Sequence, residues 1–268
     1  MNILVINLSD AVKRRKFQKQ QLFELGLEYK ILNAVSIDDI SDEIYKKHYY
    51  DWQRPLRNTE VACYFSHKSA WNKVIKTDQP ALILEDDALL SKCVPELLKS
   101  FTNKKNVDYI NFETSGRKKI ISKVGEGIAC NSKLFRLYQD RSGAAGYILW
   151  PAGAKKLLRF ERENGISLAD AQIAHCNTLV GYQLEPGHII QLNQCKHFDI
   201  PNIYSDEIQI STVSQPNNPK GHPIFWIKRI KAQVKLGVHI LSLITKSKRR
   251  YIKLNKKNFI KSREHLLE

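Results

Sequence analysis

The stretch that most constrains the fold of this chain is Pro80–Asp87, in which four apolar residues run directly into three consecutive carboxylates. A short apolar run that follows a turn residue is typical of a fully buried strand. Pro80 fits at the first position of such a strand, because proline has no N–H to donate to a neighbouring strand. Glu85, Asp86 and Asp87 then lie at its C-terminal end, which in open α/β sheets is the side that binds ligands.

Three adjacent carboxylates repel one another, and a hard divalent cation such as Mn²⁺ or Mg²⁺ relieves the repulsion because it prefers oxygen ligands. Side chains alternate along an extended strand, so Glu85 and Asp87 are expected on one face and Asp86 on the other. The alternative is a solvated acidic turn that caps the next helix, since charge clusters are usually exposed. The spacing by itself leaves both interpretations open.

The order of the remaining segments predicts an α/β protein that opens with a β-α-β unit and contains a parallel sheet. Strands are predicted at residues 1–8, 29–35, 80–84, 107–112, 133–138 and 143–150, with one or two more in 181–191. Helices are predicted at residues 10–25, 41–49, 59–76, 94–101, 151–160 and 168–179. Residues 117–131 suggest an irregular segment or hairpin, and residues 193–221 a linker rich in proline and polar residues.

The charge of the chain is concentrated at its C-terminal end. The whole sequence has 43 Lys and Arg against 27 Asp and Glu, a net charge of +16. Residues 220–268 hold 14 of the basic residues and two of the acidic ones, so this segment carries +12 and residues 1–219 only +4. Such a basic segment indicates an anionic partner, either a membrane surface or a polyanion.

Apolar residues recur at helical spacing in the same segment, with lysine and arginine between them. A basic amphipathic helix of this kind is typical of a membrane-surface element. The alternative is a helix that packs on the body and turns a basic face outward. The stripe consists of Ile224, Phe225, Ile227, Ile230, Val234, Val238, Leu241 and Ile244. We therefore expect a catalytic domain over residues 1–219 and a basic amphipathic helical tail over 220–268.

The cysteines and the N-terminus indicate where such a chain works. Five scattered cysteines without a CxxC pair favour a reduced, cytosolic protein. The N-terminus lacks the basic region and long apolar run of a secretory signal, and no stretch reaches the roughly 18 apolar residues of a spanning helix. The expected location is the cytoplasm, peripheral on the inner face of the cytoplasmic membrane.

Several common catalytic motifs are absent from the sequence. It contains no GxxxxGK[ST] phosphate loop, no GxGxxG fingerprint, no HExxH helix and no GxSxG elbow. Kinase, Rossmann dehydrogenase, zinc protease and serine hydrolase activities therefore have no positive support. In the predicted helix 59–76, His67 falls on the apolar stripe, so it is either a satisfied core histidine or a group that supports the acidic strand.

Five segments, taken together and in order, resemble glycosyltransferase family 25, which includes bacterial lipooligosaccharide galactosyl- and glucosyltransferases and animal collagen galactosyltransferases. The segments are Ile6–Leu8 with Arg14 and Arg15; Thr59–His67 with Trp71; Leu84–Asp87; Gly146–Leu149 with Gly153, Ala154, Leu157 and Leu158; and Ala169–Asp170. The resemblance implies a GT-A-like, Rossmann-type mixed sheet flanked by helices. It also implies a UDP-sugar donor, a divalent metal ion and inversion at the anomeric carbon.

The resemblance also implies roles for the acidic triplet. Glu85 and Asp87 are placed like the outer acids of a DxD motif, with Glu in place of the first Asp. Asp87 is the expected metal ligand, while Glu85 or Asp86 would contact the ribose or a metal-bound water. A histidine completes the metal shell in many enzymes of this fold, and His188 is the first candidate, with His197 as the other.

The remaining candidates lie on the donor side and beside the acceptor. Asn7, Leu8 and Arg14, at the end of the first strand, would hold uracil and phosphate, although Arg14 equally fits a solvated helix face. His67 would support the donor site from below. Inversion needs a base for the acceptor hydroxyl. Asp170 is the first candidate, its alternative role being a helix cap, and Glu113 is the second.

The sequence thus predicts an inverting, metal-assisted hexosyltransferase that moves galactose, or else glucose, from a UDP-sugar to a lipooligosaccharide or lipopolysaccharide acceptor. A metal-dependent sugar nucleotidyltransferase is the alternative within enzymes, but residues 7–10 lack the glycines of its usual loop. A non-enzymatic polyanion-binding protein is the alternative outside them. No specific nucleic-acid partner is expected, because no binding motif occurs and aromatic residues are sparse in the most basic stretch.

Overall fold

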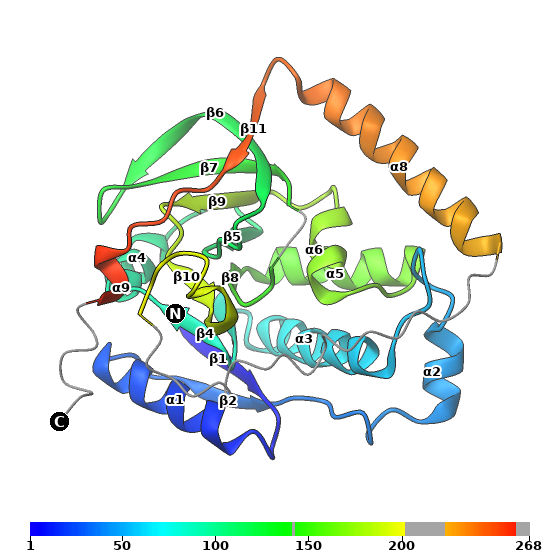
Figure 1. Ribbon diagram of the computed structural model, residues 1–268, viewed down its shortest axis with the longest axis horizontal. Helices are drawn as coiled ribbons and strands as arrows, with labels where there is room; N and C mark the ends of the chain where they lie inside the picture. The colour runs from blue at the N-terminus through cyan, green and yellow to red at the C-terminus, as the bar shows by residue number, and fades with distance from the viewer. Residues whose placement is uncertain (141–142, 202–222, 261–268) are drawn as a thin grey trace.

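The computed structural model describes residues 1–140, 143–201 and 223–260 and shows a mixed sheet flanked by helices (Figure 1). Within these residues the large sheet has the strand order β11-β6-β7-β9-β5-β8-β3-β1-β2, and β10 pairs with β4 in a small second sheet. The strands are β1 (Asn2–Asn7), β2 (Lys30–Asn33), β3 (Ala81–Glu85), β4 (Ala88–Leu90), β5 (Tyr109–Asn111), β6 (Lys118–Ile128), β7 (Ser132–Gln139), β8 (Gly146–Leu149), β9 (Gly181–Glu185), β10 (Ile189–Gln191) and β11 (Ser247–Tyr251). The predicted α/β class with a central sheet and flanking helices is confirmed.

The strand directions place the C-terminal ends of three strands at one edge of the large sheet. β2, β1 and β3 are parallel, and β8 runs antiparallel between β3 and β5. β5 therefore points the same way as β3 and β1, so the C-terminal ends of these three strands lie at one edge, as expected for the ligand side. Asn7, Glu85 and Glu113 end or follow these strands.

Helices cover both faces of the sheet and select which side chains are buried on each. The helices are α1 (Val12–Glu24), α2 (Asp42–His48), α3 (Asn58–Thr77), α4 (Val94–Phe101), α5 (Pro151–Asn164), α6 (Ala169–His175), α8 (Pro223–Leu243) and α9 (Lys257–Ile260), with a 3₁₀ turn at Leu192–Gln194. α3, α5 and α6 pack on the face that carries Leu4, Ile6 and Ile83, while α1 and α4 pack on the face that carries Val5 and Leu82. This two-sided burial explains why the strands are continuous apolar runs rather than alternating ones.

The period of two along β3 decides where the first acid points. Ala81 and Ile83 pack on the α3 face, and Leu82 and Leu84 pack on the α1 and α4 face. Glu85 is next in that alternation and meets His67 of α3.

Most predicted elements are present, and the differences have physical reasons. α6 ends at His175, not at residue 179, and the chain then turns through Cys176–Leu179. Residues 117–131, predicted as an irregular segment or hairpin, contain the long strand β6. It pairs antiparallel with β7 as the hairpin alternative expects, and the register shifts between Ile121 and Gly125. β4 follows the acidic triplet directly and was not predicted. Most of the predicted linker, residues 202–221, lies outside the described residues.

The C-terminal segment contains more than the predicted helix. α8 forms as expected, but β11 follows it and adds to the edge of the large sheet beside β6. Phe259 of α9 is fully buried in a cluster with Phe17, Ile190 and Ile200. β11 escaped prediction because four of its five residues are polar or charged, which removes the apolar signal of a buried strand.

Arg250 of β11 ties this segment to the body through an ion pair with Glu185 at the end of β9. The second guanidinium nitrogen, Nη2, lies 2.6 Å from Oε2 of Glu185. The backbone N–H of Lys253 donates to Oε1 of the same carboxylate at 2.9 Å. Burial acts to raise the pKa of Glu185, but these hydrogen bonds outweigh it and hold the pKa below its ordinary value.

We predict that Glu185→Gln destabilises the protein by about 1–3 kcal/mol at pH 7, because it weakens a partly buried, bidentate pair. A depressed carboxyl pKa contributes stability that is present above the unfolded-state pKa and is lost as the pH falls through the folded-state pKa. The difference between wild type and variant should therefore shrink as the pH is lowered below about 4. Urea unfolding as a function of pH measures this difference.

Glu163→Gln is the matched control for this prediction. Glu163 makes an exposed pair with Arg159 one helical turn away. Removing such a pair should leave the unfolding midpoint unchanged. Equal effects of the two substitutions, or a difference that does not depend on pH, would show that the Arg250–Glu185 pair does not stabilise the C-terminal segment.

Candidate functional site

A cavity of about 250 Å³ opens at the C-terminal edge of the sheet. It collects side chains that are far apart in the sequence, from the ends of β3 and β5, the start of α6 and the first turns of α3. Its walls are formed by Glu60, Cys63, Glu85, Glu113, Ser115, Arg117, Gly143, Ala144, Leu168, Ala169, Asp170, Gln191 and Gln194. Three predicted site residues, Glu85, Glu113 and Asp170, thus share one cavity.

Glu85 is held from below by a hydrogen-bond chain inside the core. The indole N–H of Trp71 donates to the hydroxyl of Tyr147 at 2.9 Å, and this hydroxyl lies 2.9 Å from Nδ1 of His67. Because the hydroxyl oxygen accepts from Trp71, the hydroxyl donates its own proton to Nδ1. The imidazole proton is therefore on Nε2. Nε2 donates to Oε1 of Glu85 at 3.2 Å. His67, which is 1% exposed, therefore supports Glu85 from the core.

Asp86 points to the opposite side and is neutralised by α1 and β1. Nη1 of Arg14 donates to its Oδ1 at 2.8 Å, and Nδ2 of Asn7 donates to its Oδ2 at 2.8 Å. The amide of Asn7 also donates to the carbonyl of Ala11 and accepts from Nε of Arg15 at 2.7 Å. Each polar atom of this buried side chain has a partner, so Asn7 positions Asp86, and its contact with the donor stays a prediction.

Asp87 is the acid whose charge is least compensated. Its Oδ1 is buried without a hydrogen-bond partner in the described structure, and its Oδ2 is 3.9 Å from Nη1 of Arg14. Burial, and then the negative charge of Glu85, raises the pKa of Asp87 to about 7. The strand ends at Glu85 and a turn follows, so the alternation does not extend to Asp87, which shares Arg14 with Asp86.

Glu113 follows β5 and has one oxygen paired and one unpaired. Oε2 accepts the backbone N–H of Ala145 at 2.8 Å, while Oε1 is buried without a partner among the described residues. Burial, and then the charge of Glu85, raises the pKa of Glu113 to about 8. Gly143 leaves room for this carboxyl: its φ is +92°, and a Cβ there would lie 2.3 Å from Oε2.

A buried lysine lies beneath Glu113. Nζ of Lys119 donates to Oδ2 of Asp140 at 2.7 Å, to Oε1 of Gln183 at 2.7 Å and to the carbonyl of Glu113 at 3.1 Å. These bonds use all three of its donors, and its positive charge acts to lower the pKa of Glu113. Lys119 was not among the predicted site residues, because a lysine in a segment predicted as irregular or a hairpin is ordinarily exposed.

Asp170 stands in the first turn of α6 at the cavity wall and is half-buried. Its Oδ1 accepts the backbone N–H of Ala171 at 2.7 Å. Burial raises its pKa above the ordinary value. Asp170 therefore pairs with the start of its helix while it remains more accessible from the cavity than Glu113, which is 1% exposed.

The structure holds His188, the predicted histidine ligand, between two serine side chains. His188 is fully buried, its Nδ1 lies 2.7 Å from the hydroxyl of Ser91, and its Nε2 lies 2.9 Å from the hydroxyl of Ser132. Both ring nitrogens are used, and burial lowers the pKa of the ring to about 4. The role of His188 as a metal ligand stays a prediction. His197, the other candidate, is exposed and its ring contacts Phe198.

The acids fit the hard divalent cation that the resemblance implies. Asp87 presents a buried carboxylate oxygen without a donor, and Glu85 places a second negative charge close enough to raise its pKa. A cation with oxygen ligands would satisfy both. Glu85 and Asp87 are thus the residues that would hold it, and Leu8 and Arg14 remain predicted contacts of the donor.

The wall of the cavity nearest Glu85 also contains Cys63, which the sequence analysis passed over. Cys63 precedes His67 by one helical turn on α3, and this spacing was the signal that could have found it. Burial, and then Glu85 and Asp170, raises the pKa of its thiol well above the ordinary value. All five cysteines of the chain are free thiols.

Comparison with known proteins places the chain in a family. Residues 1–171 match the family model for glycosyltransferase family 25 (LPS biosynthesis protein). A putative glycosyltransferase of Haemophilus influenzae is 26% identical over 197 residues, which cover 70% of this chain and 69% of that protein. The lipooligosaccharide biosynthesis protein lic2B of Haemophilus influenzae is 23% identical over 273 residues, which cover 96% of this chain and 95% of that protein. Procollagen galactosyltransferase 1-B of Xenopus laevis is 23% identical over 173 residues, which cover 59% of this chain and 28% of that protein.

We predict that the metal-free protein binds Mn²⁺ and that Asp87→Asn weakens this binding at least about 10-fold, because one anionic ligand is lost. The same variant should gain stability relative to wild type as the pH rises from 4 to 7. Over this range the unfolded carboxyl is ionised, whereas the buried one in wild type resists ionisation. Calorimetric Mn²⁺ titration and urea unfolding measure the two effects.

Asp78→Asn is the control, since Asp78 is exposed at the C-terminal end of α3. It should change neither Mn²⁺ affinity nor the pH dependence of stability. Unaltered Mn²⁺ affinity in Asp87→Asn would remove Asp87 from the metal site.

Proposed function

Because the chain belongs to glycosyltransferase family 25, we propose that it transfers a hexose from a UDP-sugar to a lipooligosaccharide or lipopolysaccharide acceptor, with inversion at the anomeric carbon. The chain is a glycosyltransferase of lipopolysaccharide biosynthesis by family. The convergence of Glu85, Glu113 and Asp170 on one cavity at the C-terminal edge of the sheet carries the finer proposal. Galactose is the favoured hexose because one relative is named a galactosyltransferase, and glucose is the alternative.

Glu85 and Asp87 would hold a divalent cation, Mn²⁺ or Mg²⁺, at the donor diphosphate. When bound, this ion stabilises the negative charge that develops on the departing nucleotide. The protein's own part is to keep the two acids in place. His67 orients Glu85, and Arg14 with Asn7 withdraws Asp86 from the cavity side.

The base that takes the proton of the acceptor hydroxyl would be Asp170. It lines the cavity, is accessible from it, and has a pKa raised toward the range in which a carboxylate accepts a proton effectively. Glu113 is the second candidate, since it lines the same cavity and its buried Oε1 has no hydrogen-bond partner among the described residues. Its deeper burial and its pKa of about 8 favour the neutral acid at pH 7, which makes it the weaker base.

The activity itself is tested with a panel of UDP-sugars, following UDP release with and without lipooligosaccharide acceptor. Acceptor-dependent UDP release from UDP-galactose, abolished by excess EDTA and restored by Mn²⁺, is the expected result. Release of pyrophosphate from a nucleoside triphosphate and a sugar phosphate would instead support the nucleotidyltransferase alternative. Salt-dependent retention of random DNA without any turnover would support a polyanion-binding protein.

We predict that Asp170→Asn lowers the turnover of hexose transfer at least about 100-fold and leaves UDP-sugar affinity within a few-fold of wild type. The amide keeps the size of the side chain but cannot accept the proton. Glu113→Gln is the comparison variant, and its turnover should fall by a smaller factor. Calorimetry measures the UDP-sugar affinity, and single-turnover kinetics measure the rate of the chemical step. Wild-type transfer by Asp170→Asn would reduce this residue to a helix cap and move the base to Glu113.

Helix α8 gives the proposal its second part, docking on an anionic membrane surface. Among the described residues no helix is long and apolar enough to cross a bilayer. α8 lies at the periphery of the molecule between the end of α2 and β11 (Figure 1). Only Phe225 and Leu243 of its 21 residues are buried, and Phe225 stacks on Tyr50. The helix is thus fixed near both ends, and its outer face has no partner among residues 1–140, 143–201 and 223–260.

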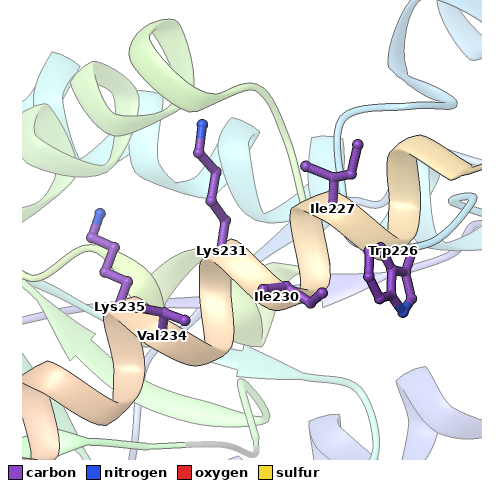
Figure 2. A pocket seen from close by; sticks show the side chains of 6 residues that line it. All are labelled: Trp226, Ile227, Ile230, Lys231, Val234 and Lys235. Atoms are coloured by element: carbon purple, nitrogen blue, oxygen red, sulfur yellow. The ribbon is translucent and has the colours of Figure 1, made fainter.

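That outer face is apolar and has lysines along one edge. Figure 2 shows Lys231 and Lys235 extending from one edge and Trp226 from the other, with Ile230 and Val234 between them. Trp226 is 68% exposed and Val234 61%. We define this outer face as Trp226, Ile227, Ile230, Val234, Val238 and Leu241. The alternative is a helix with its apolar stripe packed on the body, and among the described residues only Phe225 of that stripe is buried.

An anionic bilayer suits this face because it accepts apolar side chains and attracts lysine by about 1 kcal/mol per charge near the surface. The acceptor would be anchored in the same bilayer, so docking would raise its local concentration. The site of action would then be the inner face of the cytoplasmic membrane. Removal of all residues after 219 is unsuitable as a test, because it would also remove β11 and the buried Phe259.

We predict that the triple substitution of serine for Trp226, Ile230 and Val234 abolishes flotation with vesicles that contain anionic lipid, while transfer to a soluble acceptor fragment persists. Lys231→Gln with Lys235→Gln should weaken flotation mainly at low salt, because salt screens the charge contribution and not apolar insertion. Lys16→Gln with Lys19→Gln, on α1, is the control and should float like wild type.

Unchanged flotation of the triple variant would exclude α8 as the membrane contact. Light scattering on the same variants tests the competing occupant of this face, a second copy of the chain. A wild-type dimer that becomes a monomer in the triple variant, with flotation unaffected, would assign the face to self-association.

A further inference from the structure

The wall of the cavity beside Glu85 brings together three different metal-ligating side chains. Cys63 and His67 lie one turn apart on α3, and Glu85 ends β3. The thiol sulfur, an imidazole nitrogen and a carboxylate oxygen all lie within 4.8 Å of one another. Two of these residues come from one rigid helix, and the third comes from the central strand that the helix packs against.

These ligands differ in kind from those of the hard cation site. Thiolate and imidazole favour Zn²⁺ and other borderline-soft ions, whereas Mg²⁺ and Mn²⁺ take oxygen ligands. A set of one cysteine, one histidine and one carboxylate corresponds to a zinc site with three protein ligands, which keeps a further position open. Cys63 and Glu85 both line the cavity, so the open position would face it.

The surroundings of His67 suit a ligand histidine. The hydroxyl of Tyr147 lies 2.9 Å from Nδ1, the nitrogen that faces away from Glu85. When Nε2 binds a metal ion, the ring proton moves to Nδ1 and is donated to the Tyr147 oxygen, which has two lone pairs and already accepts from Trp71. Glu85 is fixed on its other oxygen by the side-chain amide of Gln191 at 3.2 Å.

We propose that Cys63, His67 and Glu85 form a Zn²⁺ site in the wall of the active-site cavity, which differs from the hard-cation site in having Cys63 and His67 in place of Asp87. Binding converts the Cys63 thiol to a thiolate and releases that proton to solvent. The two sites share Glu85, so they are mutually exclusive. A consequence, which rests on the proposed transferase function, is that Zn²⁺ inhibits the Mn²⁺-dependent reaction.

The test uses the full-length, metal-free protein and Co²⁺ as a spectroscopic substitute for Zn²⁺. One equivalent of Co²⁺ should produce the near-ultraviolet absorption of a thiolate-to-cobalt charge transfer, and Zn²⁺ should remove it. Competition with a chromophoric chelator gives the Zn²⁺ affinity. Cys63→Ser should lose the absorption and bind Zn²⁺ at least about 100-fold more weakly, since loss of an outer-shell partner alone costs 10–100-fold.

Cys130→Ser is the matched control. Cys130 is also half-buried and has a carboxylate neighbour, because its sulfur lies 3.0 Å from Oε2 of Glu96. This variant should keep the absorption and the affinity of wild type. His67→Gln should weaken Zn²⁺ binding and preserve part of the charge-transfer absorption, since the sulfur is retained.

Absence of the charge-transfer absorption in wild type, or its persistence in Cys63→Ser with unchanged affinity, would overturn the site. These readouts do not depend on transfer. A protein that transfers hexose with Mn²⁺ but shows no cobalt–thiolate absorption refutes the Zn²⁺ site alone. One that shows the absorption without transferring hexose refutes only the proposed function.

Discussion

The mutual repulsion of Glu85, Asp86 and Asp87 at the end of a buried strand is the constraint on which the rest of this structure depends. The fold reduces this repulsion because neighbouring acids point toward different partners. Glu85 continues the strand alternation toward α3 and His67, and Asp86 turns toward Arg14 and Asn7. Asp87 receives the weakest compensation, which leaves one buried oxygen without a hydrogen-bond partner among the described residues.

The two helices that supply these partners are held in place by the apolar faces of the sheet. α3 buries Tyr64, Trp71 and Val74 against one face, and this packing fixes the height at which His67 meets Glu85. α1 packs on the other face through Leu22, so that Arg14 reaches Asp86 from the first turns of the helix. Hydrophobic burial therefore sets the positions of α1 and α3. The polar side chains on the same helices donate hydrogen bonds to the acids of the triplet and offset part of their negative charge.

The C-terminal segment serves the catalytic body in two different ways. β11 and α9 complete it, because Arg250 pairs with Glu185 and Phe259 fills the cluster beside Phe17. α8 instead spans the periphery with an apolar outer face and lysines along one edge. Because the helix runs directly into β11, a surface bound by α8 would be held in a fixed relation to the sheet and its cavity.

The sequence by itself determined the elements whose signal is local. The helix that carries His67 and the helix after residue 223 have apolar stripes at helical spacing, and the apolar run before Glu85 has the length and the preceding proline that favour a strand. The same patterns located the acids Glu113 and Asp170 at the start or end of elements, where ligand sites form.

Only the tertiary structure decided which of these groups meet. His188 and Asn7 have residue types that suit a site, but packing surrounds His188 with two serines and commits Asn7 to Asp86. Lys119 and Cys63 became part of the site because strands and helices distant in sequence close around them, which no local pattern records. β11 belongs to the sheet through backbone hydrogen bonds at an edge, and these depend on a neighbouring strand rather than on the residues of β11 itself.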